Sequence, residues 1–283
     1  MTDFTLDRFD LDAFIAATFA EDLGDGGDVT SAAVIPETAR FKGAMDSRDA
    51  IVVAGIPIAE AFFRTLDPDV EIEVLVSEGD SVPAGTDLMR LRGLARPMLT
   101  AERSALNTVQ HMSGIATLAR RYVDEIASTG AVLLDTRKTI PGLRALEKYA
   151  TRMGGAQNHR MGLWDAAMIK DNHVAVAGGV REAVRRAVDA GIAQVIVEVD
   201  RLDQIEPALE AGATHLLLDN MPVEMLRSAV EQIGDRVPTE ASGGVTLESI
   251  NEIAKTGVDF ISVGRLTQSA PAADIGLDFA EID

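Results

Sequence analysis

Cationic side chains are concentrated in one stretch of this chain, residues 135–173. The stretch carries seven lysines and arginines and two of the four histidines, namely Arg137, Lys138, Arg144, Lys148, Arg152, His159, Arg160, Lys170 and His173. The chain as a whole has the opposite balance, with 45 Asp and Glu against 26 Lys and Arg and a formal net charge of -19. Cations gathered in an acidic protein favour a small anionic ligand, because the remaining surface would repel nucleic acid or an acidic membrane.

The types of these cations indicate which anions they could bind. Arginine matches planar carboxylates through its two-pronged donor geometry, whereas lysine suits a phosphate as a point charge. His159 and Arg160 together could bind a carboxylate and the edge of a ring, although a histidine bonded to backbone is the structural alternative. Three further cations share a helical spacing and fit a solvated helix face equally well: Arg144, Lys148 and Arg152.

Carboxylates and glycines complete the candidate site. Glu198 and Asp219 could hold a magnesium ion or accept hydrogen bonds from sugar hydroxyls, the alternative being ion pairs with the protein's own lysines. The run Ser242-Gly243-Gly244, together with Gly264, would let backbone N–H groups approach a phosphate, the alternative being a simple tight turn. We interpret Glu240, His111 and His215 as structural residues.

The polar residues of the candidate site lie at the ends of expected strands. Each follows an apolar stretch of the kind that forms a buried parallel strand. Thr136 and its neighbours Arg137 and Lys138 follow the first stretch, and Lys170 follows the second. Six strands are expected, over residues 131–134, 167–169, 194–199, 214–218, 239–241 and 260–263. Amphipathic segments between them predict repeated strand–helix units, so the strand ends would converge on one mouth. Six strands favour an incomplete barrel, with an open doubly wound sheet as the competing architecture; no glycine-rich dinucleotide motif follows the first strand.

The first hundred residues predict a different, smaller α+β domain. Asp10 is expected to cap a helix that ends near Leu23, and a second short helix is expected over 58–65. Strands are expected over 40–45, 51–54, 70–76 and 88–91. Next come two long helices, 98–112 and 114–127, broken near Ser113–Gly114, and a helix that starts at Pro141. We place the domain boundary between residues 112 and 113.

Composition sets further bounds. The chain has no cysteine, which excludes disulfides, thiolate metal sites and cysteine nucleophiles and suits a reducing cytoplasm. No secretory signal pattern or apolar run of membrane-spanning length is present, so we expect a cytoplasmic protein that binds no membrane.

Several long motifs resemble the quinolinate phosphoribosyltransferase (nicotinate-nucleotide pyrophosphorylase) family almost from end to end. They include EDLGDGGDVTS, AERSALNTVQHMSGIAT, DTRKTIPGLRALEKYA, GGAQNHRMGLWDAAMIKDNH, LLLDNM, EASGGV and GVDFISVGRLTQS. The resemblance implies an α/β protein with an N-terminal α+β sandwich domain, to which final helices could return from the C-terminus, and an incomplete six- or seven-stranded α/β barrel. It also implies a homodimer with shared active sites, which could assemble further into a hexamer.

The resemblance implies a pentosyltransferase of de novo NAD synthesis that needs Mg²⁺. Quinolinate and phosphoribosyl pyrophosphate would give nicotinate mononucleotide, carbon dioxide and pyrophosphate. In this family's pattern, Arg137, His159, Arg160 and Lys170 would meet quinolinate, and Arg103 would be lent by the partner subunit. Lys138 would meet the pyrophosphate, Glu198 and Asp219 the ribose and magnesium, and Ser242, Gly243, Gly244 and Gly264 the 5′-phosphate. One departure is Gln268, which stands where the family commonly has histidine.

Three alternatives stay open on the sequence. One is a related phosphoribosyltransferase that uses nicotinate, and another is the molybdenum-locus paralogue of the family. The third is an anion-binding barrel without turnover. The adjacent cations Arg137–Lys138 and His159–Arg160 favour a doubly charged substrate over a singly charged one.

Overall fold

The computed structural model describes residues 5–280, which form two compact units. The first unit contains the described residues up to Ala119, together with Pro141–Gly155 and the described residues from Ser269 onward. The second unit contains Arg120–Ile140 and Ala156–Gln268. Two segments that are distant from the N-terminal part in sequence therefore complete the first unit.

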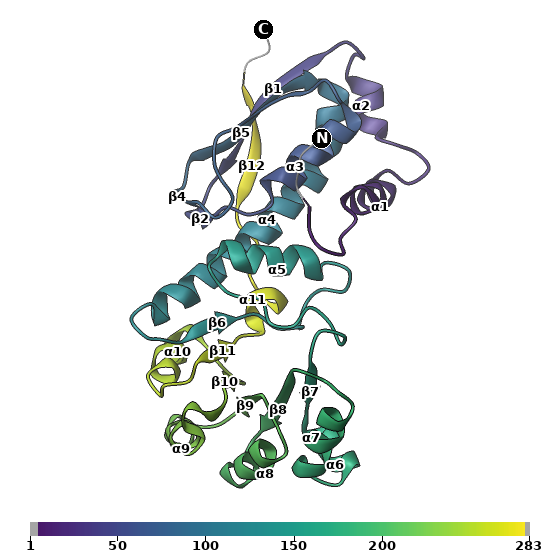
Figure 1. The fold of residues 1–283 in the computed structure, drawn as a ribbon. Coiled ribbons are helices and arrows are strands. Elements are labelled where there is room, and N and C mark those ends of the chain that lie inside the picture. The colour runs from purple at the N-terminus through teal and green to yellow at the C-terminus, as the bar shows by residue number, and fades with distance from the viewer. Residues whose placement is uncertain (1–4, 281–283) are drawn as a thin grey trace. The chain divides into compact units, whose positions relative to one another are not determined.

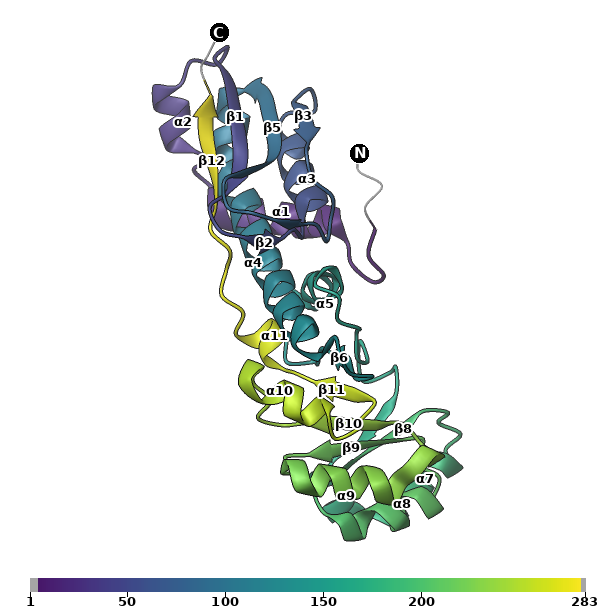
Figure 2. The same cartoon turned by 90° about the vertical axis from the view of Figure 1, so that its left-hand side faces the viewer.

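The first unit contains an antiparallel sheet with the order β12-β1-β5-β3. Figure 1 labels three of its strands, β12, β1 and β5, and Figure 2 labels all four. Its strands are β1 (Arg40–Ser47), β3 (Glu71–Val74), β5 (Thr86–Leu94) and β12 (Ile275–Ala280), and a separate pair is formed by β2 (Ile51–Val52) and β4 (Ser81–Val82). The C-terminal segment thus returns as a strand, and the expectation of returning helices is wrong. In this strand Ile275 and Gly276 are buried, Leu277 is half-buried and Asp278 is exposed.

Five helices begin among the described residues of the first unit: α1 (Leu11–Leu23), α2 (Val29–Val34), α3 (Ile56–Leu66), α4 (Ala95–Ile126) and α5 (Arg144–Met153). The Asp10 side chain accepts a hydrogen bond from the Ala13 N–H at 2.9 Å, which confirms the predicted cap of α1. Ile15 and Phe19 of that helix are buried in one apolar core with residues of α3, α4 and the sheet. The helices thereby cover the apolar side of the antiparallel sheet.

The predicted break at Ser113–Gly114 is wrong, since α4 is continuous from Ala95 to Ile126. The Ser113 hydroxyl exchanges hydrogen bonds with Ala54, accepting from its N–H at 3.0 Å and donating to its carbonyl at 3.1 Å. A β-carbon at Gly114 would lie 2.1 Å from the Pro271 carbonyl oxygen. These two small residues therefore let neighbouring backbone approach the helix and do not end it.

The start of α5 also differs from the prediction. Pro141 lies before the helix, which begins at Arg144. Gly142 has a φ of +85°, a left-handed conformation that is incompatible with a right-handed helical turn. The helix therefore starts after the glycine.

The second unit contains six parallel strands in the order β6-β11-β10-β9-β8-β7. The strands are β6 (Val132–Leu134), β7 (Ala167–Ile169), β8 (Val195–Val199), β9 (His215–Asp219), β10 (Thr239–Ser242) and β11 (Phe260–Ser262). β6 and β11, which come first and last along the chain, are neighbours in the sheet, as in a closed barrel. β6 and β7, which lie at the two edges of the sheet, are not paired within the described chain. A single parallel bridge between Leu134 and Gln157 extends the β6 edge. The predicted incomplete barrel is confirmed.

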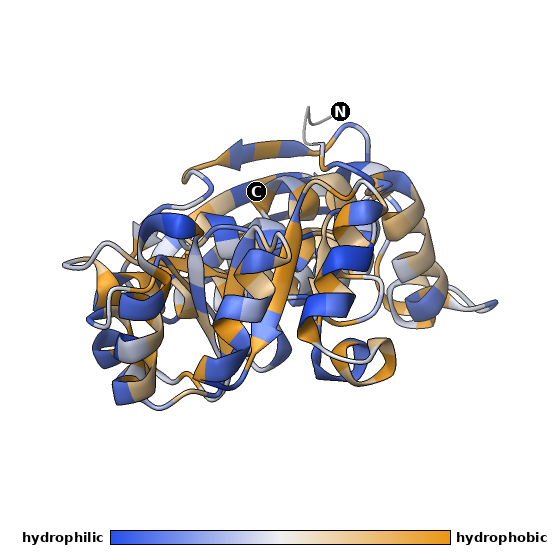
Figure 3. Ribbon diagram, turned by 60° about the horizontal axis from the view of Figure 1, so that its bottom comes forward, coloured by the Kyte–Doolittle hydropathy of each residue, from blue (hydrophilic) through white to orange (hydrophobic). Residues whose placement is uncertain are grey.

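Helices follow the strands of this unit and are striped in hydropathy, as Figure 3 shows. They are α6 (Asp171–Ala177), α7 (Val180–Asp189), α8 (Ile205–Glu210), α9 (Val223–Ile233), α10 (Leu247–Ala254) and α11 (Arg265–Gln268), with 3-10 turns at Leu202–Gln204 and Gly234–Arg236. The short helix α6 was not predicted. It buries none of its residues, so its sequence carries no apolar repeat of helical spacing. Among residues 5–280, no helix combines the length and apolarity needed to cross a membrane.

Candidate active site

The strand register places the polar side chains of the barrel in two layers. Glu198 of β8 and Glu240 of β10 are both level with Leu217 of β9. Two residues further toward the strand ends, Ser242 is level with Asp219 and with Ser262. Because side chains alternate along a strand, residues two apart share a face, so both layers point to the same side of the sheet.

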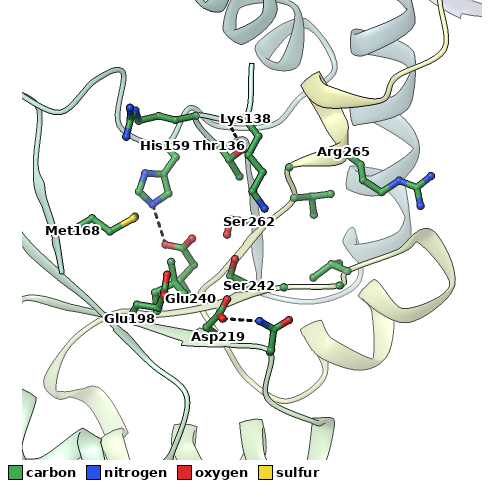
Figure 4. Close-up of a pocket in the computed structure, with 18 of the residues that line it drawn as sticks. Thr136, Lys138, His159, Met168, Glu198, Asp219, Glu240, Ser242, Ser262 and Arg265 are labelled. Atoms are coloured by element: carbon green, nitrogen blue, oxygen red, sulfur yellow. Dashed lines mark hydrogen bonds and ion pairs between the residues drawn. The ribbon is translucent and has the colours of Figure 1, made fainter. Parts of the chain in front are cut away.

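Both layers open into one cavity of about 730 Å³ at the carboxyl ends of the strands (Figure 4). Twelve of the thirteen residues predicted from the sequence line it: Thr136, Arg137, Lys138, His159, Arg160, Lys170, Glu198, Asp219, Ser242, Gly243, Gly244 and Gly264. The remaining one, Arg103, is an exposed residue of α4 in the first unit and does not line this cavity.

Two guanidinium groups form the cationic wall of the cavity. Burial, and then the charge of Arg137, lower the pKa of Arg160 below its ordinary value, against the opposing effect of Asp165. Arg160 Nη1 donates to the Ala166 carbonyl at 3.0 Å, which fixes the direction of its side chain. The Nε of Arg137 is buried and has no hydrogen-bond partner among the described residues. Two repelling cations, one with an unpaired donor, fit an anion that carries more than one charge.

The His159 ring is held at both nitrogens. Its Nδ1 accepts a hydrogen bond from the Arg160 N–H at 2.7 Å, so we assign the ring proton to Nε2, which donates to Glu240 Oε2 at 3.2 Å. The His159 backbone N–H donates to the buried Asp135 at 2.8 Å. Asp135 also accepts from Asn158 at 2.6 Å, so this aspartate organises the loop and does not face the ligand.

Glu240 forms part of the cavity and is fully buried. His215 Nε2 lies 3.1 Å from Glu240 Oε2 but is not aligned for a hydrogen bond, and Glu240 Oε1 has no partner among the described residues. Burial alone would raise the pKa of Glu240, but its interactions with His159 and His215 lower that pKa to about 2. The carboxylate is therefore ionised at neutral pH.

Glu198 and Asp219, the predicted metal ligands, have polar partners within the protein. Lys170 Nζ forms an ion pair with Glu198 Oε2, and Asn220 Nδ2 donates to Asp219 Oδ2 at 2.6 Å. No cluster of three or more potential metal ligands occurs in the described chain. The donor set suits Mg²⁺ that is held by one or two carboxylates and completed by substrate phosphates, and it does not suit an all-protein metal cage.

The glycines make room for neighbouring groups of the cavity. Gly243 has a φ of +96°, and a β-carbon there would lie 2.2 Å from Asn220 Oδ1. Gly244, with a φ of +62°, has open space in the direction of a β-carbon. Both glycines line the cavity with a left-handed backbone and no side chain, an arrangement that suits the approach of a phosphate to main-chain N–H groups.

The Lys138 loop is fixed by its backbone. The Thr136 hydroxyl oxygen accepts from the Lys138 N–H at 3.0 Å, and Thr267 Oγ1 donates to the Lys138 carbonyl at 2.8 Å. The Thr136 hydroxyl retains its own proton for donation to a ligand. The ammonium of Lys138 points into the cavity in Figure 4.

Sequence reasoning missed several lining residues, among them Met168, Thr246, Ser262 and Arg265. One of these had a usable signal, since Arg265 directly follows Gly264. Ser262 had none, because an isolated serine in a short apolar strand does not reveal which face it occupies. Gln268, noted only as a departure from the family pattern, also lines the cavity.

Known proteins match this chain along most of its length. Residues 28–113 match the model of the N-terminal domain of quinolinate phosphoribosyl transferase, and residues 115–278 match that of its C-terminal domain. The chain is 45% identical to the nicotinate-nucleotide pyrophosphorylase [carboxylating] of Mycobacterium leprae, over 91% of this chain and 93% of the relative. A chloroplastic protein of that name from Oryza sativa subsp. japonica is 42% identical, over 95% and 77%. The crystal structure of the Ehrlichia chaffeensis nicotinate-nucleotide pyrophosphorylase superposes with a TM-score of 0.92 at 36% identity, over 96% of this chain and 100% of the other.

Proposed function

Because this chain belongs to the quinolinate phosphoribosyltransferase family, we infer that it catalyses the decarboxylating reaction of NAD biosynthesis. The enzyme transfers the phosphoribosyl group of phosphoribosyl pyrophosphate to quinolinate. Nicotinate mononucleotide, carbon dioxide and pyrophosphate are the products. The expected enzyme class, a phosphoribosyltransferase, is confirmed.

One observation supports the site assignment above all others. The guanidinium groups of Arg137 and Arg160 share a cavity with the carboxylates of Glu198 and Asp219 and with a left-handed glycine turn. A pyridine diacid needs paired cations. A phosphorylated sugar needs carboxylates that accept hydrogen bonds from its hydroxyls and a glycine turn that can bind its phosphate. The cavity offers both sets of partners side by side.

We propose that Arg137, Arg160 and Lys170 bind the two carboxylates of quinolinate. The unpaired Nε of Arg137 is a donor that such a carboxylate would satisfy. His159 lies beside them, and because its ring nitrogens are engaged within the protein, we assign it to orienting Arg160. Lys170 would exchange part of its ion pair with Glu198 for the substrate.

The sugar and its phosphates would occupy the remaining side of the cavity. We place the 5′-phosphate at Ser242, Gly243, Gly244 and Gly264. Thr136 would donate a hydrogen bond to this phosphate through its hydroxyl. Glu198 and Asp219 would accept hydrogen bonds from the ribose hydroxyls and hold Mg²⁺, and Lys138 would bind the pyrophosphate. Magnesium, when bound, would neutralise charge on the phosphates of the substrate.

The proposed mechanism depends on position and charge, because the transfer needs no enzyme nucleophile. Lys138 stabilises the departing pyrophosphate while the ribose C1 gains positive charge and the pyridine nitrogen of quinolinate attacks it. The ring nitrogen then becomes cationic and can stabilise the carbanion formed when the 2-carboxylate leaves as carbon dioxide. That carbanion takes up a proton from solvent, which gives the C2–H bond of nicotinate mononucleotide. Arg137 and Arg160 must therefore orient the diacid without preventing the loss of that carboxylate.

We propose that a second copy of the chain completes each site, and that the dimers could assemble further into a hexamer. Arg103 is exposed on α4, and its guanidinium would reach the cavity of the partner subunit. We also propose a cytoplasmic location, which the cysteine-free sequence favours.

The test is an assay of the purified protein with quinolinate, phosphoribosyl pyrophosphate and Mg²⁺. Formation of nicotinate mononucleotide with release of labelled carbon dioxide from the 2-carboxylate is expected, and removal of Mg²⁺ by a chelator should abolish it. Product from nicotinate in place of quinolinate would favour the related phosphoribosyltransferase. Binding of both substrates without product would favour a non-catalytic protein.

A further inference from the structure

A buried group of three side chains lies at the base of the cavity, and the mechanism above leaves two of them without a role. Glu240 comes from β10 and His215 from β9, whereas His159 comes from the loop that follows the Leu134–Gln157 bridge. Glu240 is fully buried, and the relative exposures of His159 and His215 are 9% and 8%. Burying an ionised carboxylate costs free energy unless it is paired, so a functional role for Glu240 would explain its burial at this position.

We propose that Glu240 is a positioning residue, which fixes the His159 ring with its proton on Nε2 and thereby holds Arg160 in place for the diacid substrate. This inference rests on the proposed function, since it concerns how the same site holds quinolinate. It assigns Glu240 no contact with the substrate.

The first step of the argument is the direction of each hydrogen bond. The Arg160 N–H donates to His159 Nδ1 at 2.7 Å, and this bond requires Nδ1 to be unprotonated. A neutral imidazole then carries its proton on Nε2, where Glu240 Oε2 accepts it at 3.2 Å. An acceptor at position 240 therefore selects the one tautomer in which His159 can accept from the Arg160 backbone.

The second step connects the ring to the substrate site. Arg160 is held at its N–H by His159 and at Nη1 by the Ala166 carbonyl. If Glu240 no longer accepted from Nε2, the other tautomer would place a proton on Nδ1, opposite the proton of the Arg160 N–H. The repulsion between the two donors would move the backbone of Arg160 and misalign its guanidinium beside Arg137.

The third step concerns His215, which lies against the same Glu240 oxygen that His159 contacts. Its Nε2 lies 3.1 Å from Glu240 Oε2, its ring stacks on Phe260 with centroids 5.7 Å apart, and it does not line the cavity. His215 thus restricts where the carboxylate can lie while staying away from the ligand.

The test compares Glu240→Gln and Glu240→Leu with Glu147→Gln. Glu147 is an equally buried glutamate, 2.9 Å from His111 in the first unit, so its variant controls for the loss of a buried carboxylate–histidine pair outside the cavity. We expect Glu240→Leu to raise KM for quinolinate roughly ten- to hundredfold and to leave KM for phosphoribosyl pyrophosphate within about twofold. Glu240→Gln keeps an acceptor and should show a smaller rise, and Glu147→Gln should change neither KM.

A spectroscopic measurement keeps the proposal testable if a variant fails to fold. Nitrogen-15 NMR of histidine-labelled wild-type protein, without substrate, should show the Nε2–H tautomer for His159. The four histidines can be assigned by single substitutions. An Nδ1–H tautomer in the wild type, or an equal rise in both KM values in Glu240→Leu, would overturn the proposal. Failure of the wild type to turn over quinolinate would instead contradict the proposed function and leave the tautomer result standing.

Discussion

A β-carbon at Gly264 would lie 2.6 Å from Cδ of Lys138, so the absence of a side chain at one residue sets the path of the other. The contact involves the flexible part of a lysine, and Gly264 does not have a left-handed backbone. Alanine at this position would therefore displace Lys138 without straining the main chain.

We expect Gly264→Ala to lower kcat roughly ten- to hundredfold, because the ammonium of Lys138 would be displaced from the departing pyrophosphate. Thermal unfolding should change little. Lys138→Ala is the matched variant, and it should lower kcat at least as much. If Gly264→Ala reduced kcat further in the Lys138→Ala background by its full factor, the two residues would act independently and this account of Gly264 would be wrong.

The two glycines of the turn after β10 should differ in their tolerance to alanine. Gly243→Ala combines left-handed strain with a clash against Asn220 and should destabilise the protein by about 2 kcal/mol or more. Gly244→Ala meets open space and should cost about 1 kcal/mol. Chemical denaturation of both variants checks the order, and an equal loss in the two would contradict it.

Arg137→Ala should lower kcat/KM for quinolinate about tenfold to a hundredfold, because a charged hydrogen bond is worth roughly 1.5–3 kcal/mol. Arg137→Lys retains the charge but loses the two-pronged geometry, and we expect an intermediate effect. Steady-state kinetics with each substrate varied in turn measures both. An effect on phosphoribosyl pyrophosphate alone would move Arg137 out of the quinolinate site.

Mixed dimers should reveal whether sites are shared. A dimer of one Arg103→Ala chain and one Lys170→Ala chain would contain one intact site, if Arg103 acts in the cavity of its partner. Its activity should then reach about half that of the wild type, although each parent homodimer is nearly inactive. Co-expression with two affinity tags gives verified mixed dimers, and their inactivity would exclude the arrangement.

Stability should depend on pH through Glu240. Its folded pKa of about 2 lies below the ordinary glutamate value of 4.5. The stabilisation from its ionised form is therefore fully present above about pH 4.5 and is lost as pH falls toward 2. The stability difference between wild type and Glu240→Gln should shrink by on the order of 3 kcal/mol across this range. A difference that stays constant from pH 2 to 6 would show that folding does not shift the pKa of Glu240.

The sequence by itself determined the fold class and most of the cavity. Apolar strands with polar ends are a local pattern, and parallel strands bring such ends to one edge whatever the details of packing. Thr136, Lys170, Glu198, Asp219 and the glycines could therefore be predicted together. The strong family motifs supplied the reaction, which charge and spacing alone had left open.

Only the tertiary structure decided which polar residues face the cavity and which support it. Asp135 lies beside the cations in sequence, yet its buried carboxylate binds the backbone N–H of His159. Glu240 and His215 become partners only because β9 and β10 are neighbours in register. The return of β12 and the continuity of α4 at Gly114 likewise depend on contacts between segments more than a hundred residues apart. Such contacts leave no periodic signal in the chain, so they emerge only when it is folded.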